Sequence, residues 1–344
     1  MKNNLFILRA TLALFSLIIL ISIIYISQFS LENNGVSDDQ KSKGVTNEPP
    51  KSSDGYITKQ ELYSSGGVYN SGQFPSFDSN QELGDWVRAV SPNFAYDYWN
   101  DLYTKNKVSE LQIASRALAV TLRKEDSNAV YEDIKNRIND LDESPDRKEW
   151  LIFILGRAAT TEGVDILVNE ILDNPQHPLK EQLLKAIEDS SKWKWDEKFH
   201  VEISPILEDA WLQIEDASTI KTITKAIAKI GSPDAVALLF DYAEKNNDDE
   251  KSRAIKGSIS EIRNPETIPY LSIKLLNSSP NSTLFYLSGE TLADMGNVKA
   301  TEVLLNLRKT TSDDSVEIID EWLRRARDPD SIKLLENNSY KLDI

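Results

Sequence analysis

Residues 218–234 read STIKTITKAIAKIGSPD, and this stretch decides the fold. Isoleucines recur in it at steps of three and four residues while lysines occupy the opposite side, which is the pattern of an amphipathic helix. Gly231 ends that helix. Ser232 and Pro233 begin the next one, because a hydroxyl caps the first amides and a proline at the first helical position gives up no hydrogen bond. One helix therefore stops and another starts within a tight turn.

The same junction returns further along the chain. It recurs at Asn264-Pro265 and at Asp328-Pro329, and Gly296-Asn297 lacks only the proline. By subtraction of residue numbers, steps of 32, 33 and 31 residues separate Ile230, Ile262, Met295 and Ala326. Aligning the copies on these junctions gives one apolar column: Leu239, Leu271, Leu304 and Leu335. A single helix pair cannot bury its apolar face, so the pairs are expected to stack.

A period near thirty, paired helices, a Gly/Asn-Pro-Asp junction and an Asp-Asp loop before the second helix resemble HEAT repeats. The short bacterial variety, also found in phycobilin lyases, is similar in length. The resemblance covers residues 230–335 and extends back to about residue 146, where Pro145 starts a helix that Gly156 is expected to end. It implies an all-α solenoid whose common property is protein binding on an extended surface. No pigment-binding residues can be matched, so the lyase activity is not implied.

The N-terminal region predicts a membrane anchor. Residues 10–26 read ATLALFSLIILISIIYI without a charge, and residues 10–29 are long enough to cross a slightly thinned bilayer. A cleaved signal peptide is the alternative, but no small-residue cleavage pattern follows the run. Lys2 and Arg9 precede it and acidic residues follow, which places the N-terminus in the cytoplasm. We expect a single-pass protein with its bulk outside the cytoplasm, as in a bacterial inner membrane facing the periplasm.

Four domains follow from these patterns. Residues 1–30 form the transmembrane anchor, and residues 31–76, rich in Ser, Asn, Gly, Asp and Pro, form a flexible linker. Residues 77–144 form a helical N-terminal cap, and residues 145–344 form the HEAT-like repeat domain. Aromatic side chains concentrate in the cap, where closing the end of the solenoid is favoured over a ligand groove: Trp86, Phe94, Tyr96, Tyr98, Trp99 and Tyr103.

The charge, the composition and the motifs of the chain argue against several classes of function. A net charge of −16 repels a phosphate backbone, so nucleic acid is not an expected partner. The chain has no cysteine and two histidines, too few for the usual zinc sites. We find no glycine-rich phosphate loop, nucleophile elbow, zinc-protease or EF-hand motif, and predict neither enzymatic activity nor a cofactor. The acidic pairs Asp248-Asp249 and Asp313-Asp314 fall at the starts of helices, where capping explains them better than a metal.

The predicted function is a membrane-anchored adaptor that binds another protein in an envelope assembly. The alternative is an envelope polymer hydrolase or carbohydrate-binding protein, with Trp193 and Trp195 stacking on sugars. The same two tryptophans are candidate partner contacts, since alternating Lys and Trp in a loop exposes apolar area, although core packing explains them equally well.

A stripe along the second helices, which line the concave surface of HEAT stacks, is the second candidate interface. Counting nine and five residues back from each junction residue gives Lys221, Lys225, Arg253, Gly257, Tyr286, Glu290, Glu317 and Glu321. The stripe passes from basic to acidic. This order predicts a partner of complementary polarity or head-to-tail self-association, whereas chance ordering of a few charges is the simpler explanation.

Overall fold

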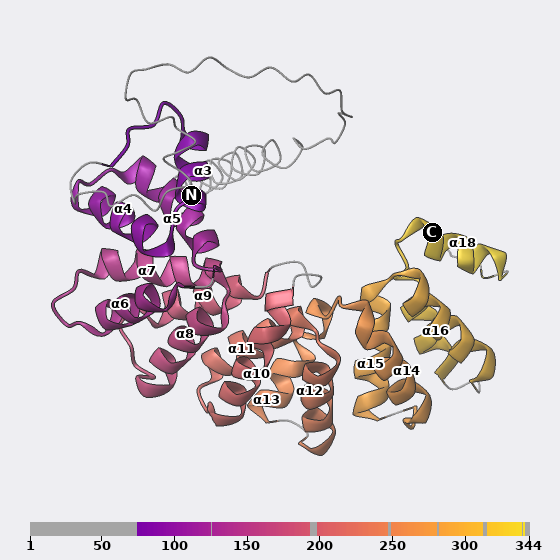
Figure 1. Cartoon of the computed structure of the whole chain (residues 1–344). Helices are drawn as coiled ribbons and strands as arrows, with labels where there is room; N and C mark the ends of the chain where they lie inside the picture. Colours follow the sequence, from indigo (N-terminus) through magenta and orange to yellow (C-terminus); the bar gives the residue numbers. More distant parts are fainter. Residues whose placement is uncertain are drawn as a thin grey trace, which may run out of the picture. The chain divides into compact units, whose positions relative to one another are not determined.

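The computed structural model describes residues 74–124, 126–192, 198–246, 249–280, 282–311, 315–338 and 340, with side chains left out at 198–201. Within these residues the fold is all helical, with no strand. The helices follow one another as packed pairs, an arrangement consistent with a helical solenoid (Figure 1). The predicted all-α class is therefore confirmed for the described part of the chain.

Two rows of helices make up this arrangement. The odd row consists of α3 (Asn80–Ala89), α5 (Val108–Thr121), α7 (Pro145–Ala158), α9 (Lys180–Ser190), α11 (Ala217–Ile230), α13 (Glu250–Lys256), α15 (Thr283–Met295) and α17 (Val316–Leu323). The even row consists of α4 (Pro92–Thr104), α6 (Asn128–Asn139), α8 (Thr161–Asp173), α10 (Lys198–Gln213), α12 (Pro233–Lys245), α14 (Ile268–Asn277), α16 (Val298–Thr310) and α18 (Pro329–Asn337).

Each row packs along its own length and against the other row. Within the odd row, α5 contacts α3 and α7, and α9 contacts α7 and α11. Two short 3₁₀ turns add to these contacts: η1 (Ile259–Glu261) packs on α11 and α15, and η2 (Pro265–Thr267) packs on α12 and α14. The core lies between the rows, and the predicted leucine column is buried in all four copies: Leu239, Leu271, Leu304 and Leu335.

The junctions between an odd and an even helix have the predicted capping chemistry. Gly231 and Gly296 adopt left-handed conformations, with φ of 58° and 60°, in which a side chain would be strained. Ser232 accepts a hydrogen bond from the amide of Ala235, and Asn297 accepts one from Ala300. These two junctions therefore end one helix and start the next, as the sequence indicates. At Asn264-Pro265, by contrast, α13 has already ended at Lys256, and Pro265 begins a 3₁₀ turn before α14.

Gly156 does not end a helix, contrary to the sequence-based expectation. It lies inside α7, which continues to Ala158, and the left-handed residue after the helix is Ala159, with φ of 51°. The reason for a glycine at position 156 is packing: a Cβ built there would lie 2.6 Å from the carbonyl oxygen of Ala186 on α9. Gly156 thus lets two odd helices approach closely.

The aromatic residues near the N-terminal end of the described chain pack on one another. Trp86 lies with its ring centroid 5.0 Å from that of Tyr98 and 5.5 Å from that of Phe94. Phe74, which falls in the predicted linker, packs on the same cluster, 5.1 Å from Tyr98. Trp99 is fully buried and its indole N–H donates to Ser115 on α5. These contacts hold α3, α4 and α5 together, and a role in closing the end of the solenoid stays a prediction.

Among the described helices, none combines the length and the apolar run that a bilayer crossing requires. The predicted span at residues 10–29 lies outside the described residues, as does most of the predicted linker.

Candidate functional site

The basic end of the predicted stripe takes part in ion pairs between neighbouring odd helices. Lys225 on α11 is half-buried, and its Nζ lies 3.0 Å from Glu188 on α9 and 3.8 Å from Glu261 on η1. Lys229 joins the same cluster, with its Nζ 2.8 Å from Glu188. Lys225 therefore forms ion pairs within the protein, which reduces the positive charge that it presents to a partner.

The acidic end of the stripe also forms hydrogen bonds and ion pairs within the protein. Glu290 on α15 accepts a hydrogen bond of 2.9 Å from the indole N–H of Trp322 on α17 and a charged one from Arg325, which follows α17. Glu321 lies 3.4 Å from the same Arg325. Because Trp322 is buried, Glu290 fixes α15 against α17 rather than facing solvent alone.

Five other members of the stripe lie at the surface. Lys221 and Glu317 are exposed on α11 and α17, and Tyr286 is 39% exposed on α15. Arg253 is exposed on α13 and lies 2.7 Å from Glu250 on its own helix, and Gly257 is exposed directly after that helix. The structure therefore places the predicted stripe on successive odd helices, but divides it into structural residues and accessible ones.

Breaking the Glu188 cluster should reveal its contribution to stability. Hydrogen bonds from Lys229 and Lys225 lower the pKa of Glu188 from its usual 4.5 to about 2, against the opposing effect of burial. A depressed folded-state pKa stabilises the protein above the unfolded pKa, and this stabilisation is lost as pH falls through the folded pKa. We expect Glu188→Gln to cost about 1 kcal/mol above pH 4.5, with the difference vanishing towards pH 2.

Urea unfolding of both proteins across this pH range measures the effect. Glu181→Gln on the same helix is the matched control, since Glu181 is exposed at the first turn of α9. A constant difference between wild type and Glu188→Gln at all pH values would contradict the assignment.

Several other candidate residues lie outside the described residues: Trp193, Trp195, Asp248, Asp313 and Asp314. Asp249 is described, and its carboxylate accepts a hydrogen bond from the amide of Ser252, which is the capping role expected of it. No cluster of three or more metal-ligating side chains occurs in the described part of the chain.

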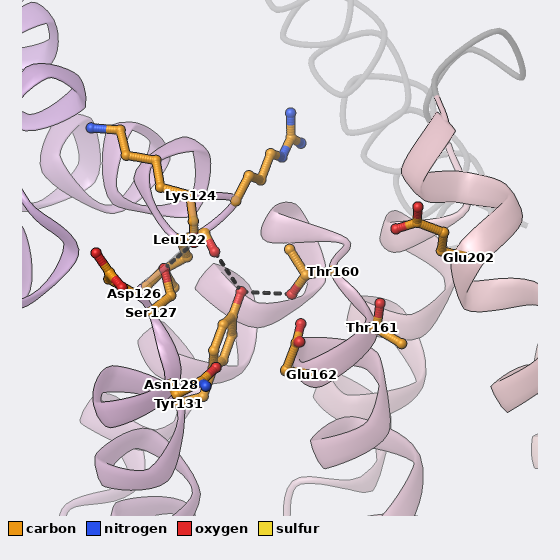
Figure 2. A pocket seen from close by; sticks show the side chains of 11 residues that line it. Leu122, Lys124, Asp126, Ser127, Asn128, Tyr131, Thr160, Thr161, Glu162 and Glu202 are labelled. Carbon is orange, nitrogen blue, oxygen red and sulfur yellow. Dashed lines mark hydrogen bonds between the residues drawn. The ribbon is translucent and has the colours of Figure 1, made fainter.

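A hollow of about 410 Å³ lies where the turn between α5 and α6 meets the start of α8 (Figure 2). At its centre the hydroxyl of Tyr131 donates to the carbonyl of Leu122 at 3.0 Å and shares a hydrogen bond of 2.6 Å with Thr160. Burial raises the pKa of Tyr131. The hydroxyl therefore ties the turn after α5 to the start of α8. Three acids also line the hollow: Asp126, Glu162 and Glu202.

Two cations in the turn after α5 reach in opposite directions. Arg123 donates from Nε to the carbonyl of Ala158, at the end of α7, at 3.0 Å. Lys124 donates to the carbonyls of Arg88 and Val90, at the end of α3, at 2.6 and 2.8 Å. Each satisfies carbonyls that a helix end leaves without a partner. The sequence offers no signal for these contacts beyond the basic residues themselves.

Neither a scan against protein-family models nor a search of the curated proteins finds a match for this chain.

Proposed function

We propose that the protein is a HEAT-like scaffold that binds another protein through the solvent-facing side chains of its odd row, which we call the odd face. The proposal includes the anchor at residues 10–29, an extracytoplasmic position for the rest of the chain and a role in an envelope assembly. One observation carries it: Lys221, Tyr286 and Glu317 are exposed on three different helices of one packed row. A surface shared by successive repeats is the usual binding surface of stacked helical pairs.

Site-specific photocrosslinking in cells tests this function. A photoreactive phenylalanine analogue replaces Tyr286 on the odd face, or Glu132 or Asp209, which are exposed on the even row. We expect protein adducts from Tyr286 and none from the two even-row positions. Adducts from the even row alone, or none from the odd face, would reject the proposal.

Charge reversal sharpens the result. Lys221→Glu combined with Glu317→Lys should lower the adduct yield from Tyr286 several-fold, because rim charges mainly set the rate of association. Lys225 and Glu290 are left unchanged, since their ion pairs hold neighbouring helices together. An unchanged yield would mean that these two charges do not face the partner.

A further inference from the structure

The odd face carries a second feature over α5 and α7, outside the predicted stripe. The two helices are equally long and pack side by side. Counted from their first residues, positions 6, 9 and 13 are Ile113, Arg116 and Val120 on α5, and Trp150, Phe153 and Arg157 on α7. We call these six residues the arginine–aromatic patch.

All six residues point to the same side of the row. Residues spaced by three and four positions share one face of a helix. Even-row helices and neighbouring odd helices cover the other sides of α5 and α7, so the face that is left is the one towards solvent. Arg116 and Arg157 are exposed, Val120 is 37% exposed, and Ile113, Trp150 and Phe153 are half-buried.

The apolar part of the patch is fixed in place. Trp150 and Phe153 meet edge to face, with ring centroids 6.0 Å apart. Both rings pack on the core from one side and keep part of their surface in solvent. Tryptophan and arginine are the side chains most enriched where interfaces concentrate their binding energy. A pre-ordered aromatic surface also costs a ligand little entropy.

The two arginines of the patch make it locally positive, whereas the chain as a whole is negatively charged. Burial and the neighbouring charge of Arg116 lower the pKa of Arg157, whereas Asp189 on α9 acts in the opposite direction. Asp189 is itself bound by Lys185 and Lys192. By contrast, α8 in the even row contains four acids and no base. A positive patch on a chain of net charge −16 favours a negatively charged ligand at the patch, although the chain as a whole repels one.

We propose that the arginine–aromatic patch binds a segment of a partner protein in which a carboxylate stands next to a large apolar side chain. The exposed Arg116 guanidinium takes the carboxylate, as arginine does at recognition sites, and the rings and aliphatic side chains take the apolar group. The inference rests on the proposed function and specifies its partner. The net charge of −16 disfavours an anionic lipid surface or a nucleic acid, because either would also meet the acidic remainder of the chain, whereas a short peptide segment need not.

Selection from a displayed library of random dodecapeptides against the purified full chain tests the proposal. We expect enrichment of peptides with Asp or Glu beside Leu, Phe or Trp. Fluorescence polarisation of the best peptide should then show binding at least tenfold weaker for Arg116→Glu and for Trp150→Ala, and weaker binding at higher salt. Arg116 is exposed, so its reversal leaves the fold intact, which circular dichroism verifies.

Arg263→Glu is the matched control, because Arg263 is an exposed arginine at a junction away from the patch, and its peptide affinity should stay within about twofold. Enrichment of basic peptides, no enrichment, or equal affinity for Arg116→Glu and wild type would overturn the proposal. Binding to phosphatidylglycerol vesicles or to a single-stranded oligonucleotide would also overturn it if Arg116→Glu weakens that binding more than it weakens peptide binding, a comparison in which the anchor is common to both proteins. If Tyr286 yields adducts while the peptide result fails, the proposed function stands and only this patch is wrong.

Discussion

Replacing Trp322 with alanine is expected to lower the free energy of unfolding by about 3–5 kcal/mol, the usual cost of truncating a fully buried large aromatic residue. The indole is 1% exposed and lies directly over Gly289, where a Cβ would fall 2.0 Å from the ring. Its N–H donates to Glu290 at 2.9 Å. Truncation therefore opens a cavity between α15 and α17 and leaves part of the Glu290 carboxylate without its donor. Urea unfolding followed by far-ultraviolet circular dichroism measures the loss.

Two variants separate packing from hydrogen bonding at this position. Glu290→Gln keeps an acceptor for the indole but removes the charge that holds Arg325. Trp322→Phe keeps most of the ring volume and removes the N–H. We expect both to cost less than Trp322→Ala. A loss below about 1 kcal/mol for Trp322→Ala would show that the ring is not the contact that joins α15 to α17.

The second large effect is expected at Gly156, where alanine should destabilise the protein by about 1–3 kcal/mol or more. On helix propensity alone the change would gain about 1 kcal/mol, so the two arguments predict opposite signs. Sterics should win, because the added Cβ would lie 2.6 Å from the carbonyl oxygen of Ala186 and 2.7 Å from its Cα. Backbone atoms cannot rotate away as a flexible side chain can, so α7 and α9 must move apart.

Gly84→Ala provides the control for this substitution. Gly84 is also buried inside a helix of the odd row, α3, but an added Cβ would meet only side-chain atoms, at 3.5 Å or more. We expect Gly84→Ala to be neutral or stabilising. Should both alanine variants unfold at the same urea concentration or a higher one than wild type, the close approach of α7 and α9 would be refuted.

Most of the fold could be predicted from local patterns. The isoleucine periodicity around residue 223 and the glycine or asparagine junctions each depend on residues that are neighbours in sequence. The structure has helices and capped turns at those places, such as Gly231 with Ser232. A glycine in the sequence can indicate either the end of a helix or a close contact between two helices. Gly231 ends a helix through its backbone conformation, whereas Gly156 sits inside one because a neighbouring helix needs the space, and the sequence within α7 does not distinguish the two roles.

The candidate site was less accessible to sequence reasoning because it depends on which helices become neighbours. Counting residues placed Lys225 and Glu290 correctly on the odd row, but their partners Glu188 and Arg325 are 37 and 35 residues away in the chain. The arginine–aromatic patch was missed for the same reason. Its residues on α5 and on α7 each form an ordinary half-exposed helix face. They form a patch only because the two helices pack side by side in register.

The turn that follows α5 also determines how the first repeats can come apart. Arg123 caps the end of α7 and Lys124 caps the end of α3, so one short loop serves the helices on both of its sides. Peeling α3 and α4 from the stack leaves a lysine without its carbonyls, and peeling α7 leaves an arginine without its own. Unfolding of the first three helix pairs is thus coupled. We expect these pairs to unfold together as one cooperative unit and not one pair at a time.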